Sequence, residues 1–296
     1  MSQSEEGDRV AGRFRLTPAR SWGRYTRTYL QFHSKKGKTS VLTGVILDLD
    51  GTVYLGSQQV PGASDFVAFL ADKGIQCLFV TNRSNRKPED VAGHLQEYGI
   101  PCEVEHVLTS SQAAVQYLKS GSAYVIGEEG LTSELSKAGI AITDRDPDYV
   151  IVSLDRQFSY EKLTTACNLI AGGATFIATN PDKVLKVATG LNPGTGSIVA
   201  AVEAASGVKP LVIGKPEKLI MEMALARMGL AAEDVLAVGD NVMTDIPAGA
   251  AAGMRTVLLL TGVSQRHEAD SGPFRPDWVL DGFAELTALV RELTES

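Results

Sequence analysis

Short apolar runs alternate with amphipathic stretches from residue 41 onward. Runs rich in Val, Ile and Leu predict buried strands, and apolar residues three or four positions apart predict helices. The expected strands are Val45–Leu49, Gln76–Val80, His106–Leu108, Ala123–Ile126, Tyr149–Val152, Thr175–Ala178, Leu211–Ile213, Val235–Val238 and Thr256–Leu260. The main expected helices are Ser64–Lys73, 88–98, Ser111–Lys119, Leu131–Ala138, Tyr160–Ala171 and 216–228. This alternation predicts an α/β protein with a parallel sheet.

Strands that end in acids occur in two separate parts of the chain, residues 41–121 and residues 207–296. The intervening residues 122–206 repeat the same strand and helix order. We therefore expect a Rossmann-like, doubly wound parallel-sheet core built from the two outer parts. Residues 122–206 are expected to form an inserted, smaller α/β domain.

Residues 1–40 differ from the rest of the chain in charge. They contain nine Lys or Arg against three acids, whereas the whole chain has a formal net charge of −7. A basic tail is typical of contact with nucleic acid or an anionic surface. A transit peptide is another interpretation, against which the early acids Glu5, Glu6 and Asp8 argue. We expect a poorly ordered basic extension, and the acidic body argues against a nucleic-acid-binding core.

The composition is that of a globular protein. Hydrophobic residues make up 44% of the 296 residues. Apolar runs such as Val257–Leu260 are far shorter than a membrane span. Cys77, Cys102 and Cys167 lack the spacing of metal ligands and suit a reducing compartment. We expect a cytoplasmic protein without a membrane partner.

The expected strand at Val45 runs directly into two carboxylates, Asp48 and Asp50, and Gly51 and Thr52 follow. Burying a carboxylate is unfavourable unless a metal, a proton or a hydrogen-bond donor compensates it. Alternate residues of a strand share a face. The pattern therefore predicts a strand that delivers two acids to one site.

Three further polar motifs follow apolar strands. They are Thr81-Asn82, Gly214-Lys215-Pro216, and Gly239-Asp240-Asn241 with Thr244-Asp245. Pro216 is expected to open a helix with Lys215 at its start. Ligands of open α/β sheets bind outside the carboxyl ends of the strands, where all four motifs fall. Each motif alone is common in turns, but their joint appearance indicates a catalytic site.

The residue types indicate a phosphate and a hard divalent cation. Mg²⁺ is bound by oxygen ligands, often a few carboxylates together with water and a phosphate oxygen. The cation screens the repulsion between a carboxylate nucleophile and a phosphate dianion. A lysine beside them stabilises the charge of the transferring group.

These motifs resemble those of the haloacid dehalogenase (HAD) superfamily, over about residues 41–290. The family string D-x-D-G-T matches Asp48 to Thr52, the strand ending in Ser or Thr matches Thr81, the lysine motif matches Lys215, and G-D-x-x-x-T-D matches Gly239 to Asp245. Other strings resemble the NagD-like, 4-nitrophenylphosphatase branch, which includes phosphoglycolate and pyridoxal phosphate phosphatases. They are Thr81-Asn82, Leu154-Asp155-Arg156, Thr179 to Asp182, Pro193 to Ser197 and Ile213 to Pro216. That branch carries an α/β cap where residues 122–206 lie.

The resemblance implies a role for each motif. Asp48 is expected to be the nucleophile that forms an aspartyl-phosphate, and Asp50 the acid and base. The expected Mg²⁺ ligands are Asp48, the backbone carbonyl of Asp50, and Asp240, supported by Asn241 and Asp245. The expected phosphate-binding residues are Thr81, Asn82, Arg83 and Lys215.

One residue departs from the branch, which usually has a second Asn where this chain has Arg83. Arg83 is expected either to bind a second anionic group of the substrate or to face solvent. The cap is expected to set specificity, with Asp155, Arg156, Asp182 and Leu185 as candidates. The resemblance also implies a small phosphorylated metabolite as substrate and dimerisation through the cap.

The chain is thus predicted to be a Mg²⁺-dependent phosphatase. Two other classes stay open at this point. One is a phosphotransferase that uses an acceptor other than water, and the other is a non-catalytic ligand-binding relative.

Overall fold

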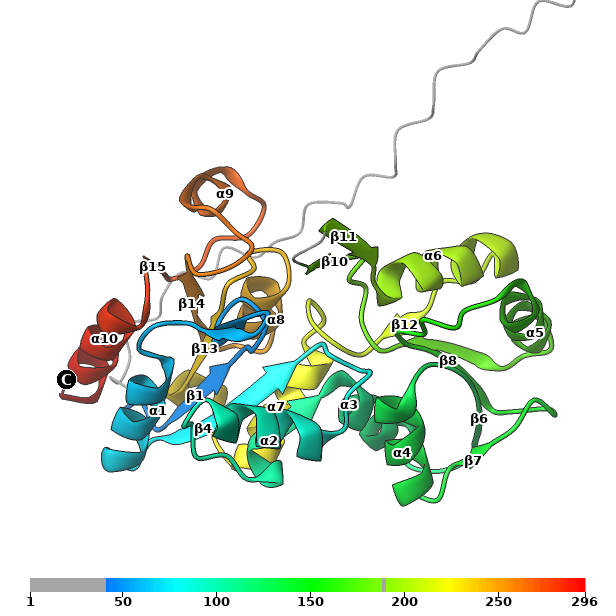
Figure 1. Ribbon diagram of the computed structural model, residues 1–296, viewed down its shortest axis with the longest axis horizontal. Coiled ribbons are helices and arrows are strands. Elements are labelled where there is room, and N and C mark those ends of the chain that lie inside the picture. The colour runs from blue at the N-terminus through cyan, green and yellow to red at the C-terminus, as the bar shows by residue number, and fades with distance from the viewer. Residues whose placement is uncertain (1–40, 188–189, 296) are drawn as a thin grey trace, which may run out of the picture. The chain divides into compact units, whose positions relative to one another are not determined.

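Two parallel sheets organise the part of the chain that this computed structural model describes, residues 41–187 and 190–295. The predicted basic extension, residues 1–40, lies outside the described residues. Figure 1 shows the elements of both sheets. The prediction of an α/β fold with a Rossmann-like parallel sheet and a second parallel α/β sheet is confirmed.

The first sheet has six strands in the order β15-β14-β13-β1-β4-β5, and every neighbouring pair is parallel. The strands are β1 (Gly44–Leu47), β4 (Gln76–Thr81), β5 (Val107–Thr109), β13 (Val235–Gly239), β14 (Arg255–Leu259) and β15 (Trp278–Leu280). β1 lies in the middle and is buried along its whole length. The carboxyl ends of β1, β4 and β13 therefore meet at the centre of one edge, as the strand motifs require.

Alternate residues of β1 face two different hydrophobic clusters. Val45 and Leu47 pack in the cluster that includes side chains of α1 (Ala63–Asp72), α2 (Pro88–Glu97) and α10 (Phe283–Glu295). Ile46 packs in the opposite cluster with side chains of α3 (Ser110–Leu118), α7 (Leu219–Met228) and α8 (Asp245–Ala251). Helices thus cover both faces, which explains why this strand is an uninterrupted apolar run.

The second sheet has five strands in the order β12-β9-β8-β6-β7, again all parallel. They are β6 (Ser122–Ile126), β7 (Ala141–Ile142), β8 (Tyr149–Val152), β9 (Thr175–Ala178) and β12 (Leu211–Val212). Val150 and Val152 pack with side chains of α5 (Tyr160–Ala171) and α6 (Thr195–Ser206). Ile151 faces the other way, toward the cluster that holds side chains of α4 (Glu129–Lys137).

The position of β12 corrects one expectation. Leu211 and Val212 were assigned to the outer core that begins again at residue 207, but they pair with Ile177 and Ala178 of β9 in the second sheet. The backbone continues this pairing, because Gly214 donates a hydrogen bond to the carbonyl oxygen of Thr179 (2.9 Å). A short apolar run does not say which sheet it joins. The domain boundaries themselves stay a prediction.

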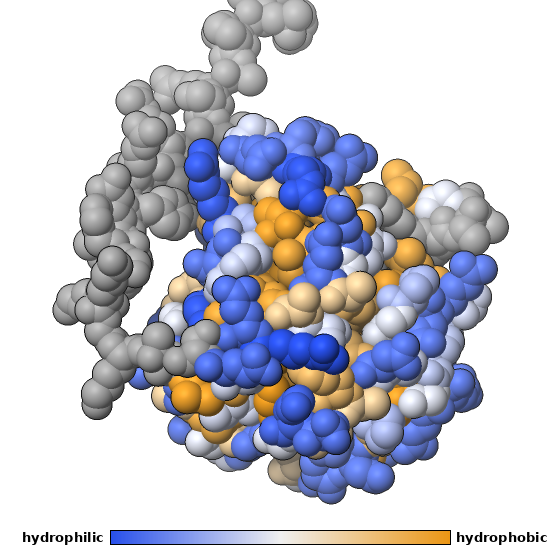
Figure 2. Space-filling model, turned by 90° about the vertical axis from the view of Figure 1, so that its left-hand side faces the viewer, coloured by the Kyte–Doolittle hydropathy of each residue, from blue (hydrophilic) through white to orange (hydrophobic). Residues whose placement is uncertain are grey.

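Two antiparallel hairpins complete the strands. They are β2 (Tyr54–Leu55) with β3 (Gln58–Gln59), and β10 (Val184–Val187) with β11 (Gly190–Pro193). The remaining elements are α9 (Arg266–Ser271) and two 3₁₀ turns, Val104–His106 and Ala232–Asp234. Within the described residues no helix is long and apolar enough to cross a membrane. Figure 2 shows a face on which hydrophilic residues separate small apolar patches, as is usual for a surface in water.

Candidate active site

Asp48 lies one residue beyond β1, where its backbone N–H still donates to the carbonyl oxygen of Val238 (2.9 Å). This bond continues the sheet and holds Asp48 at its carboxyl edge. The side chain is buried and forms an ion pair with the Nζ of Lys215. Burial raises the pKa of Asp48 above its ordinary value, and the charge of Lys215 acts in the opposite direction.

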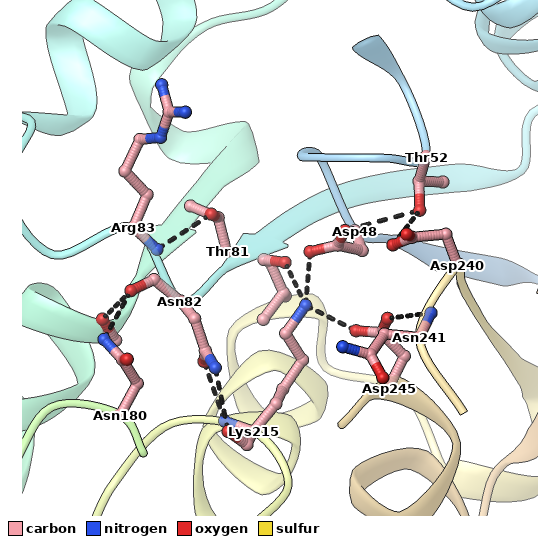
Figure 3. A network of polar contacts seen from close by, with 12 residues as sticks. Asp48, Thr52, Thr81, Asn82, Arg83, Asn180, Lys215, Asp240, Asn241 and Asp245 are labelled. Atoms are coloured by element: carbon pink, nitrogen blue, oxygen red, sulfur yellow. Dashed lines mark hydrogen bonds and ion pairs between the residues drawn. The ribbon is translucent and has the colours of Figure 1, made fainter. Parts of the chain in front are cut away.

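Lys215 is buried and reaches three acceptors at once (Figure 3). Besides Asp48, its Nζ lies 2.6 Å from Oδ1 of Asp245 and 3.2 Å from the carbonyl oxygen of Val80. Burial disfavours the ammonium form, but the two carboxylates outweigh it and raise the pKa of Lys215. The lysine therefore stays charged where two of the predicted site carboxylates meet.

The expectation that Pro216 opens a helix is wrong. The Lys215–Pro216 peptide bond is cis, residues 214–218 form turns and bends, and α7 begins only at Leu219. Lys215 thus comes from a connecting loop between β12 and α7. Proline at a helix start and proline in a turn share the same local signal, because both need its fixed φ angle.

Asp240 follows β13 and is buried beside Asp48 and Asp245. One carboxylate oxygen of each acid lies within 4.8 Å of the others. Gly51, whose φ is +97°, permits this approach, since a Cβ atom there would lie 2.2 Å from Oδ2 of Asp240. Burial and the charges of Asp48 and Asp245 raise the pKa of Asp240 to about 8.

The charge balance of this cluster fits a divalent cation. Three buried carboxylates share one buried ammonium among the residues described, and both Asp240 and Asp245 have raised pKa values, the latter about 6. Burial is the largest cause in both cases. Carboxylate oxygens are the ligands that Mg²⁺ prefers, and a bound cation would offset the unfavourable burial of charge.

Asp50 points toward a different partner. Its Oδ1 accepts a hydrogen bond from Nη2 of Arg83 at 2.5 Å, and the guanidinium carbon lies 5.9 Å from the ring centroid of Tyr54. Tyr54 is fully buried, so it offers Arg83 a fixed platform. Arg83 is therefore ion-paired and does not simply face solvent, while its contact with substrate stays a prediction.

Thr81 is the last residue of β4, and Asn82 follows it directly. The hydroxyl oxygen of Thr81 accepts a hydrogen bond from the N–H of Arg83 (3.0 Å), which fixes the turn after the strand. Both amide hydrogens of Asn82 are in use, because Nδ2 donates to the carbonyl oxygen of Lys215 and to Oδ2 of Asp182, each at 2.8 Å. The side chain of Asn82 thus bonds to the protein, and its predicted contact with phosphate stays untested.

Two family models match the chain. One, described as haloacid dehalogenase-like hydrolase, matches residues 45–141, and the other, described as HAD-hydrolase-like, matches residues 212–286. The 5'-nucleotidase YutF of Bacillus subtilis (strain 168) is 41% identical over 246 residues, or 82% of this chain and 96% of that protein. The chain belongs to the haloacid dehalogenase superfamily.

Other comparisons narrow the position within the HAD superfamily. An acid sugar phosphatase of Staphylococcus aureus (strain COL) is 40% identical over 253 residues, which cover 84% of this chain and 96% of that protein. The solved structure of NagD from E. coli K-12 superposes with a TM-score of 0.79 at 38% identity, covering 83% of this chain and 98% of that one. This chain is a HAD-type phosphatase of the NagD/p-nitrophenyl phosphatase-like subfamily.

The four cap candidates of this HAD phosphatase lie in different surroundings. Asp155 is buried and accepts from Lys162 (2.5 Å) within the cap. The exposed guanidinium of Arg156 bonds Glu128 through Nε (2.8 Å) and Nη2 (2.7 Å). Leu185 lies on β10 and is exposed, whereas Asp182 contacts Asn82 of the core.

Some residues at the HAD site carried no separate prediction. The hydroxyl of Thr52 is buried and lies 3.4 Å from oxygens of both Asp48 and Asp240. The backbone N–H of Val263 donates to Oδ2 of Asp240 at 2.5 Å. Thr52 was visible inside the first motif. Val263 follows β14 in a Thr-Gly-Val string, and this position after an apolar strand was the only available signal.

Proposed function

We propose that this HAD phosphatase is a Mg²⁺-dependent enzyme that hydrolyses a small phosphomonoester metabolite through an aspartyl-phosphate. The observation that carries the proposal is the buried ion pair of Lys215 with Asp48, inside a cluster that also holds Asp240 and Asp245. A nucleophile, an ammonium and a candidate cation site there occupy one edge of the sheet.

The proposed ligands of Mg²⁺ are Asp48, the backbone carbonyl of Asp50, and Asp240. Asp245 is assigned a supporting role, because Oδ1 pairs with Lys215 and Oδ2 accepts from the N–H of Asn241 (3.0 Å). When bound, the cation supplies positive charge that lets a phosphate dianion approach a carboxylate.

The proposed reaction has two halves. A carboxylate oxygen of Asp48 attacks phosphorus, the bond from phosphorus to the ester oxygen breaks, and Asp50 gives its proton to that oxygen. Asp50 then takes a proton from water, which attacks the aspartyl-phosphate, releases inorganic phosphate and restores Asp48. Lys215 holds the nucleophile and the oxygens of the transferring group, with Thr81, Asn82 and Arg83 proposed to assist.

Small phosphorylated metabolites are the proposed substrates. The relatives named as a 5'-nucleotidase and an acid sugar phosphatase support this class without selecting one member. Cap residues Arg156 and Leu185 are proposed to contribute to the choice. We also propose a cytoplasmic location, which the three free cysteines support, and a homodimer formed through the cap.

The decisive test is the release of inorganic phosphate from p-nitrophenyl phosphate and from a panel of metabolites, with and without Mg²⁺. Wild type is expected to turn over, and Asp48→Asn to show no detectable release, since an amide is a poor nucleophile. Near-native turnover by Asp48→Asn would contradict the assignment. Addition of alcohol acceptors should yield phosphate and not a new ester, and a dominant ester product would indicate a phosphotransferase.

A further inference from the structure

Asn82 lies at a junction of three chain segments (Figure 3). Its Oδ1 accepts the backbone N–H of Lys215 (2.9 Å), and its Nδ2 donates to the carbonyl oxygen of the same residue (2.8 Å). The second hydrogen of Nδ2 goes to Oδ2 of Asp182 (2.8 Å). The side chain of Asn82, which directly follows β4, therefore forms hydrogen bonds with the backbone of Lys215 and with a residue of the cap.

The backbone of Asn82 carries a second link to the cap. Its carbonyl oxygen accepts from Nδ2 of Asn180, which is buried, at 2.8 Å. It also accepts from the hydroxyl of Ser110 in the core at 2.9 Å. A carbonyl oxygen has two lone pairs, and these two donors occupy both. Asn82 is thus held from the core side and from the cap side.

Two glycines allow close packing around this junction. A Cβ atom at Gly214 would lie 2.5 Å from Oδ1 of Asn82, and one at Gly194 would lie 2.2 Å from the carbonyl oxygen of Asp182. Backbone segments can approach this closely only where both positions are glycine. The close fit indicates that the three segments are built to meet at one point.

The origin of Lys215 explains why such a junction matters. Lys215 follows β12, a strand of the second sheet, and yet its Nζ pairs with Asp48, which follows β1 of the first sheet, and with Asp245 at the start of α8. A displacement between the two sheets would therefore move the ammonium relative to the nucleophile. The two hydrogen bonds from Asn82 oppose such a displacement, because they hold the backbone of Lys215 at the end of β4.

We propose that Asn82 and Asp182 act as positioning residues, which set the ammonium of Lys215 against Asp48 and make that placement depend on the docked cap. This inference rests on the proposed function, because it assigns Lys215 to the phosphoryl group. Asp182 acts through Asn82 and does not contact the substrate. The cap would thus contribute to the rate of the chemical step as well as to specificity.

Asp182→Ala tests the proposal, with Asp182→Asn as the conservative variant. Alanine removes the acceptor for Asn82, whereas asparagine keeps an acceptor oxygen in the same place. We expect kcat of Asp182→Ala to fall about 10-fold, since a small misplacement of a catalytic group costs up to about 100-fold. KM should change little, and Asp182→Asn should restore most of the rate.

Two substrates separate positioning from direct contact. The loss of kcat should be the same for p-nitrophenyl phosphate and for glycerol 2-phosphate, because Lys215 acts on the phosphoryl group that both share. A rise of KM confined to one substrate would overturn the proposal, since it would indicate that Asp182 contacts the organic part. Equal kcat for wild type and Asp182→Ala would overturn it as well.

Glu89→Gln is the matched control. Glu89 on α2 pairs with Lys137 on α4 at 2.6 Å, so it also joins core to cap, but both side chains are about half exposed. Its kcat should equal that of wild type. A loss of kcat in Glu89→Gln as large as in Asp182→Ala would mean that general cap docking, and not this junction, matters.

A readout that needs no turnover keeps the inference separate from the proposed function. A double-mutant cycle compares the free energies of unfolding in urea of Asn82→Ala, Asp182→Ala and the double variant. The loss of free energy in the double variant should be smaller than the sum of the losses in the two single variants. Additive losses would mean that Asn82 and Asp182 do not stabilise each other, and this would overturn the proposal even if the enzyme is active. If the cycle shows coupling but wild type hydrolyses no ester with Mg²⁺, the proposed function fails and the junction stands.

Discussion

At the scale of single residues, Asp48 and Asp50 are neighbours in sequence with different environments. Asp48 is buried against Lys215, whereas the carboxylate of Asp50 is 42% exposed and bonds Arg83. Two carboxylates with different surroundings can take different chemical roles. This difference in surroundings agrees with a nucleophile at Asp48 and a proton carrier at Asp50. It also assigns Arg83, the partner of Asp50, a role that can be tested.

Arg83→Met is expected to impair proton transfer. Without the guanidinium, the half-exposed Asp50 loses the partner that fixes its orientation. Because general acid catalysis contributes about 10²–10⁴-fold, we expect kcat for a poor leaving group such as glycerol 2-phosphate to fall about 10-fold. The loss for p-nitrophenyl phosphate should be smaller, since p-nitrophenolate needs little protonation. Steady-state kinetics with both substrates measures the difference.

Arg86→Met is the control for this experiment, because Arg86 is an exposed arginine three residues further along the same segment. Its rates should match those of wild type on both substrates. An equal loss on good and poor leaving groups in Arg83→Met would contradict the orienting role. That outcome would leave Arg83 with only its proposed contact with the phosphoryl group.

Asp240→Asn should separate metal binding from folding. The substitution removes one of three clustered buried charges and keeps an oxygen that accepts from Val263. In EDTA we expect the variant to be at least as stable as wild type, because like-charge repulsion is relieved. Added Mg²⁺ should raise the melting temperature of wild type and not that of the variant. Equal shifts in both proteins would argue against Asp240 as a ligand.

At the scale of elements, strands and helices with a regular apolar pattern were predicted correctly, and short segments without such a pattern were not. The expected bounds of β8, β9 and α5 agree with the structure at both ends. Each is an apolar run or a full amphipathic helix, so local sequence decides it. The hairpins β2–β3 and β10–β11 were missed, because β2 and β3 have only two residues each and β11, the partner of the short run β10, contains Gly, Asn and Pro.

In the candidate site, too, some contacts could be predicted from the sequence and others could not. Asp48, Asp240 and Asp245 were predicted to gather because the carboxyl ends of parallel strands share one edge. The contact of Asn82 with Asp182 spans 100 residues and depends on how the second sheet packs against the first. No periodicity in the chain encodes that packing, so only the folded structure brings these residues together.

Glu128, the N-cap residue of α4, forms an ion pair in the cap that can be tested through pH. Its carboxylate accepts from the side chain of Arg156 and from Nδ2 of Asn85 (3.3 Å), a core residue, and the bonds from Arg156 lower its pKa to about 2. A carboxyl group with a lowered folded pKa stabilises the protein above its unfolded pKa. That stabilisation is lost as the pH falls from about 4.5 to about 2.

Glu128→Gln should therefore be less stable than wild type at neutral pH, by about 1 kcal/mol, since Arg156 is largely in water and screened. The difference should shrink as the pH falls below about 4.5. Urea unfolding at several pH values measures it. Arg156→Gln serves as the partner variant, and a difference that does not change with pH would contradict the assigned ion pair.

At the scale of the whole molecule, the two sheets share one hydrophobic cluster. Ile46 and Leu78 of the first sheet and Ile151 of the second belong to the same set of buried contacts, with Leu135 of α4 among them. By contact, the described residues also group into a single unit. A core that is continuous across both sheets couples their stability, because neither sheet can separate without exposing apolar surface.

We therefore expect the two sheets to unfold together. Calorimetry should show one transition whose van't Hoff and calorimetric enthalpies agree. Leu135→Ala removes a fully buried side chain of the shared cluster and should cost about 2–5 kcal/mol. It should shift the single transition to lower temperature without splitting it. The exposed Ile142 on β7 provides the control, since Ile142→Ala removes little buried surface. A separate early transition in Leu135→Ala, with the first sheet still folded, would show that the cap unfolds independently and that the shared cluster does not couple the sheets.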